Sequence, residues 1–362
     1  MIRTIDRIKP RGIKALSMVL GGVFLILGTT GTPSAQEGQE EMTPPSAGVV
    51  LIYHRFGEGD YPSTNTQIAQ LEAHIDVLNA PDAYQIMRLD ALLDARRSGT
   101  THTRPTVAIS VDDAYKSVIT EAWPRLKAAG IPLAVFVATD PIDAGNPNYM
   151  TWGDLRQLAA EGVYIGHHGA SHAAYLDLDD AAVIQDIEKA NTRFKAELGT
   201  VPRIFAWPFG EYDARLLGLI QGMGFEHAFA QFSAPLPVTG DDFALPRFPI
   251  NEQYGELDRF RLVTRSLPLA LADVLPTDSI LNQENNPPSY GFTLLDPPSS
   301  LETLSCYPSH LGQAADLEVI EGDRVEVRFD RPFPTGRNRI NCTMPAGNGR
   351  WFWIGKFFMV PN

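Results

Sequence analysis

Two adjacent carboxylates end an apolar segment of the chain. Residues 107–111 read Val-Ala-Ile-Ser-Val, and Asp112 and Asp113 follow directly. A run of apolar, partly β-branched residues predicts a buried strand, whose carboxyl end then opens at the two acids. Because like charges this close repel each other, we expect a cation or a shared proton beside them. The alternative is a solvated turn, in which an Asp-Asp pair is also common.

Two histidines four residues apart, His168 and His172, follow another short apolar segment. Together with Asp113 they would give a divalent ion three protein ligands and leave positions open for water, as in catalytic Zn²⁺ sites. Such an ion lowers the pKa of water and polarises a carbonyl, and Asp112 would take the proton from that water. The sequence therefore predicts hydrolysis of an amide or ester. The alternative is a pair of solvated or capping histidines.

Strands and helices are expected to alternate in the part of the chain that contains these residues. Apolar runs predict buried parallel strands at residues 49–53, 107–111, 132–137, 162–166, 203–207 and 228–230. Amphipathic helices are expected between them, because apolar residues recur there at three- and four-residue steps. This alternation is typical of a (β/α) barrel, in which the groups that follow the strands share one edge. His54, at the end of the first strand, also lies at that edge.

Composition changes divide the chain into five predicted segments. Residues 1–35 combine basic residues, an apolar run and small residues, which is typical of a secretory signal peptide; an uncleaved anchor is the alternative. The other predicted segments are a linker (36–47), an α/β domain (48–268), a second linker rich in Pro and Asn (269–292) and a small antiparallel β domain (293–362). We therefore expect an exported protein, periplasmic or secreted, with no stable membrane span after cleavage.

Charge and cysteine content restrict the class of protein further. The 362 residues have a formal net charge of −13 at pH 7 and 44% hydrophobic residues. This composition is typical of a globular protein and argues against nucleic-acid binding, which requires a basic surface. The two cysteines are Cys306 and Cys342. An even number in an exported chain favours one disulfide, and two free buried thiols are the alternative.

Three stretches of the chain resemble the main motifs of the polysaccharide deacetylases, the NodB-homology family or carbohydrate esterase family four. They are Ser-Val-Asp-Asp-Ala (110–114), His-His-Gly-Ala-Ser-His (167–172) and Phe-Ala-Trp-Pro-Phe-Gly-Glu-Tyr-Asp (205–213). Tyr53-His54-Arg55 and Thr151-Trp152 resemble the bacterial poly-N-acetylglucosamine deacetylase branch. The resemblance implies a distorted (β/α) barrel that removes N-acetyl groups from N-acetylglucosamine polymers with a divalent metal, usually zinc.

The resemblance also implies a role for each matching residue. Asp112 matches the catalytic base, and the metal ligands match Asp113, His168 and His172. Phe209 would offer its backbone N–H to the oxyanion, as a preorganised donor must. Substrate contacts are expected from Trp207, Pro208, Tyr212 and Arg247.

The chain departs from the family pattern in three places. Ala114 follows the two acids, where glycine is usual, and Ala206 stands where an arginine usually orients the base. Arg247 could replace that arginine, and a surface or scaffold arginine is the alternative. The family's Leu-x-His motif, which supplies the acid for the leaving amine, is absent. His54 is therefore our candidate for the acid or for a substrate contact, whereas His227 is expected to be structural.

The function expected from these features is metal-dependent removal of N-acetyl groups from an extracellular or cell-wall polysaccharide. The absent Leu-x-His motif and the absent arginine at position 206 support an alternative, a non-catalytic glycan-binding protein with the same fold. A hydrolase acting on another amide or ester is the third possibility.

Overall fold

The computed structural model describes residues 48–361 apart from residues 239 and 299. The predicted signal peptide (1–35) and first linker (36–47) lie outside the described residues. Within the described part of the chain, no helix has the length and apolar character needed to cross a membrane.

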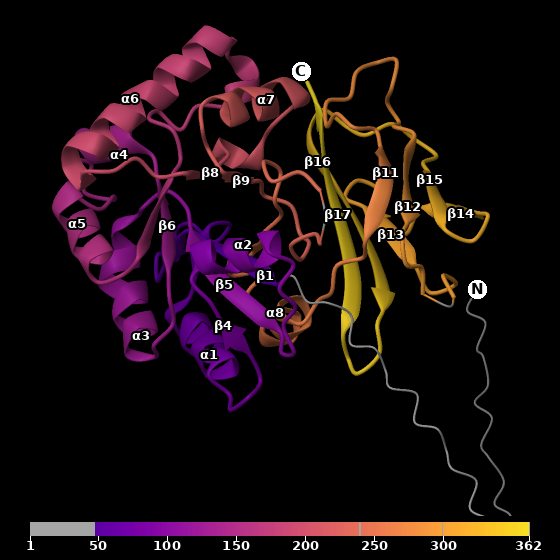
Figure 1. Cartoon of the computed structure of the whole chain (residues 1–362), viewed down its shortest axis with the longest axis horizontal. Coiled ribbons are helices and arrows are strands. Elements are labelled where there is room, and N and C mark those ends of the chain that lie inside the picture. The colour runs from indigo at the N-terminus through magenta and orange to yellow at the C-terminus, as the bar shows by residue number, and fades with distance from the viewer. Residues whose placement is uncertain (1–47, 239, 299, 362) are drawn as a thin grey trace, which may run out of the picture. The chain divides into compact units, whose positions relative to one another are not determined.

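Eight parallel strands form the sheet of the larger domain (Figure 1). Seven of them follow the spatial order β10-β1-β5-β6-β7-β8-β9, and β4 pairs with the start of β5. Their bounds are β1 (Val49–Tyr53), β4 (Gln85–Ile86), β5 (Thr106–Val111), β6 (Ala134–Val137), β7 (Tyr164–His167), β8 (Ile204–Ala206), β9 (His227–Phe229) and β10 (Phe248–Pro249). An isolated bridge between Phe229 and Leu245 brings the two ends of this order together. The predicted distorted (β/α) barrel is therefore confirmed.

Helices connect the strands and cover the outside of this sheet (Figure 1). They are α1 (Ile68–Leu78), α2 (Leu89–Arg97), α3 (Trp123–Ala128), α4 (Thr139–Asp143), α5 (Trp152–Ala160), α6 (Asp180–Leu198), α7 (Ala214–Gly222) and α8 (Leu257–Thr264). The longest, α6, shows how the sequence sets these elements. Its N-cap Asp179 accepts a hydrogen bond from the Ala182 N–H, and Gly199 ends it with a φ of 75°.

The C-terminal part of the chain forms two antiparallel sheets, which confirms the predicted β domain. One contains β11 (Leu271–Leu275), β12 (Tyr290–Leu294), β15 (Arg324–Arg328) and β14 (Asp316–Ile320), in that spatial order. The other contains β13 (Ser305–Pro308), β16 (Gly336–Pro345) and β17 (Trp351–Val360). Because β11 pairs with β12, residues 271–275 of the predicted second linker belong to a sheet.

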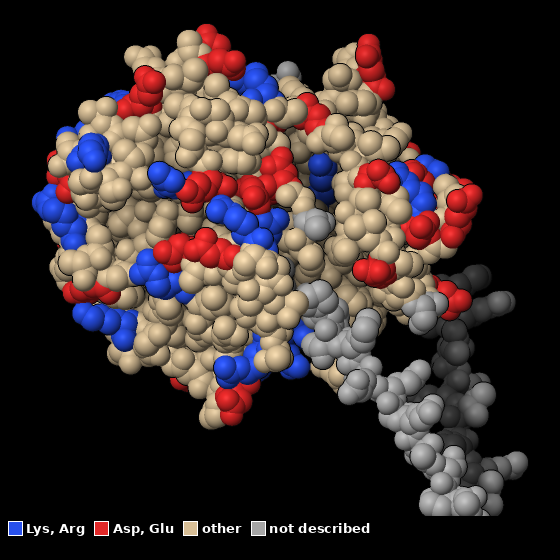
Figure 2. All heavy atoms as spheres, in the orientation of Figure 1, with Lys and Arg blue, Asp and Glu red and all other residues tan. Residues whose placement is uncertain are grey.

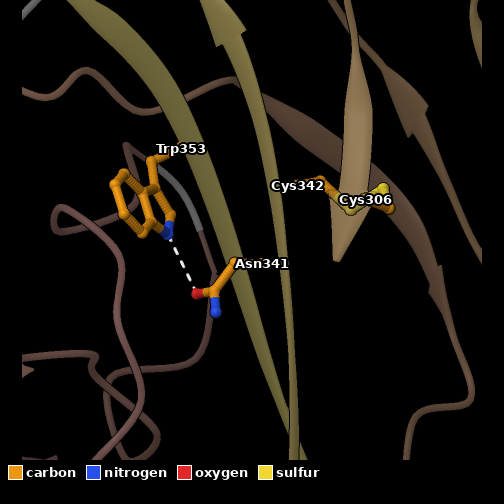
Figure 3. The surroundings of a disulfide bond; sticks show 4 residues. All are labelled: Cys306, Asn341, Cys342 and Trp353. Atoms are coloured by element: carbon orange, nitrogen blue, oxygen red, sulfur yellow. Dashed lines mark hydrogen bonds between the residues drawn. A yellow bond between two sulfur atoms is a disulfide. The ribbon is translucent and has the colours of Figure 1, made fainter. Parts of the chain in front are cut away.

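Strands β16 and β17 have two packed faces, so they join the β domain to the barrel. Cys342 on β16 forms a disulfide with Cys306 on β13 and lies in the core of the β domain. On the other side of the same strands, the Trp353 Nε1–H donates to Asn341 Oδ1 at 3.0 Å (Figure 3). The Trp353 ring packs edge-on against Phe248 of the barrel. The alternation of side chains along a strand gives one face to each core.

Candidate active site

The two acids lie where β5 ends and the backbone turns sharply. Strands β1 and β5 pair in register, and the Asp112 N–H donates to the Tyr53 carbonyl at 3.0 Å. This contact places Asp112 beside the end of β1, which His54 follows. Asp113 and Ala114 have φ values of 73° and 55°, in the left-handed region that favours glycine. The geometry therefore explains why a glycine is the easier residue at position 114.

Three of the predicted side chains converge into one cluster of possible metal ligands. One ligand atom each from Asp113, His168 and His172 lies within 4.8 Å of the other two. Asp113 Oδ1 is 3.5 Å from His168 Nε2 and 3.1 Å from His172 Nε2. Two ligand atoms bound to one tetrahedral zinc ion lie roughly 3.4 Å apart. The donor types and their separations therefore fit a zinc-like divalent cation.

Neighbouring groups fix the orientation of the two histidines. The His168 Nδ1–H donates to the Ala206 carbonyl at 2.7 Å, which leaves the Nε2 lone pair free for a ligand. The Asp186 carboxylate of α6 accepts hydrogen bonds from the backbone N–H groups of Ala170 and Ser171 and from the Tyr175 hydroxyl. These contacts hold the loop that contains His172, whose own φ is 56°.

Charge is concentrated at this cluster. Burial alone would raise the pKa of the Asp113 carboxyl, but hydrogen bonds to His168 and His172 hold that pKa well below its usual range. Burial disfavours the charged form of His168, yet the carboxylates of Asp112 and Asp113 outweigh this effect and raise its pKa. The site therefore favours a negative carboxylate next to positive charge.

A buried bidentate ion pair holds Asp112. The Arg247 Nη1 and Nη2 groups donate to the two oxygens of Asp112 at 2.7 and 2.8 Å, and both side chains are almost fully buried. Burial raises the pKa of the Asp112 carboxyl, but Arg247 and His168 outweigh burial, so the pKa is lowered. Arg247 thus contacts Asp112, as expected for a replacement of the arginine absent at position 206. It does so from the segment before β10.

Phe209 lies on an unusual turn directly after β8. Its φ and ψ are 60° and 0°, and Gly210 also has a positive φ, of 72°. The Phe209 ring lies edge-on to the ring of His172, with 4.6 Å between the ring centroids, so the turn lies next to the ligand cluster. Among the described residues, the Phe209 N–H makes no backbone hydrogen bond outside this turn.

His54 is also at this edge of the sheet. Its ring is half-buried, and burial lowers its pKa although Asp113 and Asp112 act in the opposite direction. The pairing of β1 with β5 places His54 beside the residues that follow β5. The two later histidines lie elsewhere. His227 is the first residue of β9, so it lies at the amino end of that strand, and it contacts Arg97. The His310 ring packs on Phe333 of the β domain.

Three of the predicted substrate contacts lie beneath the site surface. Trp207 and Pro208 are buried, and the Trp207 Nε1–H donates to the Phe243 carbonyl at 2.8 Å. Tyr212 is 5% exposed and packs between Trp207 and Phe357 of β17. Their burial argues against direct contact with a polymer. They support the turn at Phe209, whose own side chain is 42% exposed.

Two contacts at this site were missed by the sequence analysis. Asp186 lies on an amphipathic helix, where an acid is indistinguishable from the solvated acids around it. Arg337, on β16 of the β domain, donates to the Phe209 carbonyl at 2.9 Å. Arg337 and Phe209 are 128 residues apart in the sequence, so no local pattern could indicate this contact.

One face of the described surface carries mixed charge. On the face shown in Figure 2, Lys and Arg groups lie among Asp and Glu groups rather than in one basic patch.

Comparison with known proteins finds similarity to one family. Residues 99–228 match the sequence profile of the polysaccharide deacetylase family. YxkH of Bacillus subtilis, named as a candidate polysaccharide deacetylase, is 23% identical over 180 residues, which span 49% of this chain and 62% of YxkH. The poly-β-1,6-N-acetyl-D-glucosamine N-deacetylase of Staphylococcus aureus is 21% identical over 218 residues, which span 57% of this chain and 74% of that protein.

Solved structures show the same fold. The deacetylase PplD of Streptococcus pyogenes, solved with acetate, superposes with a TM-score of 0.53 at 14% identity and covers 58% of this chain and 94% of its own. IcaB from Ammonifex degensii superposes with a TM-score of 0.51 at 20% identity and covers 60% of this chain and 97% of its own.

Proposed function

We propose that this chain is a metal-dependent polysaccharide N-deacetylase, because its residues 99–228 match the sequence profile of the polysaccharide deacetylase family. Its substrate would be an N-acetylglucosamine polymer outside the cell. The observation that supports the proposal most strongly is the convergence of Asp113, His168 and His172 beside the Asp112–Arg247 pair. The named activity of the staphylococcal relative supports the choice of substrate class.

Each residue has a proposed role in amide hydrolysis. A divalent ion such as Zn²⁺, held by Asp113, His168 and His172, would supply Lewis-acid polarisation and a more acidic water. Asp112 accepts the proton of the attacking water, and Arg247 holds both carboxylate oxygens so that the base keeps one orientation. The Phe209 N–H donates to the oxygen that becomes negative as the carbonyl carbon becomes tetrahedral.

The proton for the leaving amine has a less obvious source. The Leu-x-His histidine is missing from the sequence, and His227 and His310 lie elsewhere in the structure. His54 follows β1 beside the acids and is our proposed donor or substrate contact. If it does neither, turnover would be slow, and binding of the glycan would be the second candidate function.

Export is a separate part of the proposal. The signal-like pattern of residues 1–35 supports it, and the Cys306–Cys342 disulfide agrees with an oxidising compartment. The periplasm or the extracellular space would give the enzyme access to surface polysaccharide. Mass measurement of the mature N-terminus tests cleavage of the segment.

Acetate release from N-acetylglucosamine oligomers of β-1,6 and β-1,4 linkage tests the activity. We expect release by the zinc-loaded protein and a loss of at least about 100-fold in Asp112→Asn, because that substitution removes the base. Asp258→Asn is the matched control, since its side chain is exposed on α8. Glycan binding without acetate release from any linkage would instead support the binding-protein alternative.

A further inference from the structure

The C-terminal β domain contacts the proposed oxyanion turn directly. Arg337 of β16 donates from Nη1 to the Phe209 carbonyl at 2.9 Å, and its Nε lies 3.4 Å from Glu211 Oε1. One side chain therefore holds a backbone carbonyl and a carboxylate on the two sides of Gly210. We infer that Arg337 is a positioning residue, through which the β domain sets the orientation of the Phe209 N–H.

The turn needs such a contact because its backbone is held in an unfavourable conformation. Phe209 has a φ of 60°, which costs a residue with a side chain on the order of 1 kcal/mol. The bonds within the turn are the Gly210 N–H to the Trp207 carbonyl at 2.8 Å and the Glu211 N–H to the Pro208 carbonyl at 3.3 Å. Rotation of the 209–210 peptide would move the Phe209 carbonyl away from Arg337. The arginine therefore favours the observed turn over relaxed alternatives.

The same strand supports the turn at a second point. Arg339 lies two residues after Arg337, on the same face of β16, and its Nε–H donates to the Gln231 carbonyl at 3.3 Å. Gly210 packs so closely on Gln231 that a side chain at position 210 would clash with it. The two arginines thus hold both the turn and the segment beneath it.

The opposite face of β16 explains why this position is stable. Ile340 and Cys342 lie in the core of the β domain, and the disulfide to Cys306 ties β16 to β13. Figure 3 shows the disulfide on one side of the strand pair and Asn341 with Trp353 on the other. The arginine is therefore presented from a rigid strand rather than from a loop. This gives the β domain a role in catalysis through its contact with the turn.

Arg337→Met and Arg337→Lys, made in the full-length protein, test the inference. Its kinetic readout rests on the proposed deacetylase function. We expect Arg337→Met to lower kcat roughly tenfold, less than the ~100-fold loss typical of removing an oxyanion donor itself, with KM within about twofold. Arg337→Lys should recover part of kcat, because it keeps one charged donor. Arg328→Met is the matched control, since Arg328 makes exposed ion pairs on β15.

Hydrogen exchange gives a readout that does not depend on activity. In Arg337→Met, the amides of Gly210 and Glu211 should exchange faster, while zinc affinity and the melting temperature stay close to those of the wild type. An unchanged kcat or unchanged exchange at these two amides would overturn the inference. So would a loss of kcat that follows an equal loss of zinc affinity or thermal stability. If wild-type protein releases no acetate, the proposed function fails, and the exchange experiment still decides the role of Arg337.

Discussion

Arg247 and Asp112 form a pair whose geometry lysine cannot reproduce. The guanidinium binds both carboxylate oxygens, donates to the Ala230 carbonyl and lies within 5.5 Å of the ring centroids of Phe136 and Phe229. Arg247→Lys keeps the charge but loses the two parallel hydrogen bonds. We expect acetate release to fall by about 10- to 100-fold and the free energy of unfolding to fall by about 1–3 kcal/mol.

Kinetics and urea denaturation measure these two effects in the same preparation. Arg261→Lys on α8 is the control, because Arg261 is exposed and its ion pair with Asp258 is loose. Wild-type acetate release by Arg247→Lys would show that the bidentate pair does not orient the base.

Ala114 offers a test of backbone strain at the end of β5. Its methyl group is fully buried, so Ala114→Gly loses about 0.8 kcal/mol of burial, but it relieves about 1 kcal/mol of left-handed strain. The net change in unfolding free energy should stay within about 0.5 kcal/mol. Ala190→Gly, at a buried site inside α6, should cost about 2 kcal/mol, because there helix propensity and burial are both lost. Equal losses in urea denaturation would contradict the strain argument.

At the scale of elements, the sequence predicted what periodicity can encode. The strands β1 and β5 are almost continuous apolar runs. The two acids after β5 show, from the sequence alone, where this strand ends. β2 (Arg55–Phe56) and β3 (Asn65–Thr66) are two-residue strands, too short to produce a pattern. In β11, buried and exposed side chains alternate only weakly, and its pairing with β12 contains a register shift. The sequence pattern therefore predicts a linker at this strand.

Contacts between distant elements could not be predicted in the same way. A charged residue on an alternating strand is expected to face solvent, so the contact of Arg337 with Phe209 leaves no trace in the local sequence. The proximity of Arg247 to Asp112 is expected only from the family resemblance, because Ala206 stands where the family has the arginine that orients the base. The role of Asp186 depends on where α6 packs, and periodicity does not specify that.

His74 of α1 contacts the segment before α8, and this buried histidine should make the stability of the protein depend on pH. His74 is buried between Tyr53, the Gly255 carbonyl and the stacked ring of Phe260. Burial lowers its pKa to about 4, although the hydrogen bond to Gly255 opposes the shift. The unfolded chain, with a histidine pKa of about 6.5, binds more protons between these values. Stability is therefore greatest above pH 6.5 and falls as the pH drops towards 4, by about 3 kcal/mol.

His74→Gln isolates this contribution, because glutamine keeps hydrogen-bonding groups but does not titrate. The stability difference between the wild type and His74→Gln should shift by about 3 kcal/mol in favour of the variant between pH 7 and pH 4. Urea denaturation at several pH values measures it. A difference that stays constant over this range would mean that His74 does not titrate differently in the folded state.

At the scale of the whole molecule, the described residues belong to one compact unit. β17 supplies Ile354 and Phe358 to the core of the β domain and Trp353 and Phe357 to the barrel side. The two long strands lie beside the barrel in Figure 1. Trp353 and Phe357 are therefore interface residues, whereas Phe358 belongs to the core of the β domain. The domain boundary at residues 269–292 stays a prediction.

The dependence of acetate release on a divalent ion tests the central claim most directly. Protein stripped by a chelator and then titrated with Zn²⁺ should lose acetate release and recover it at about one ion per chain, because Asp113, His168 and His172 form one three-ligand site. His172→Gln should need more Zn²⁺ for the same recovery. Full acetate release by the metal-free protein would contradict the account.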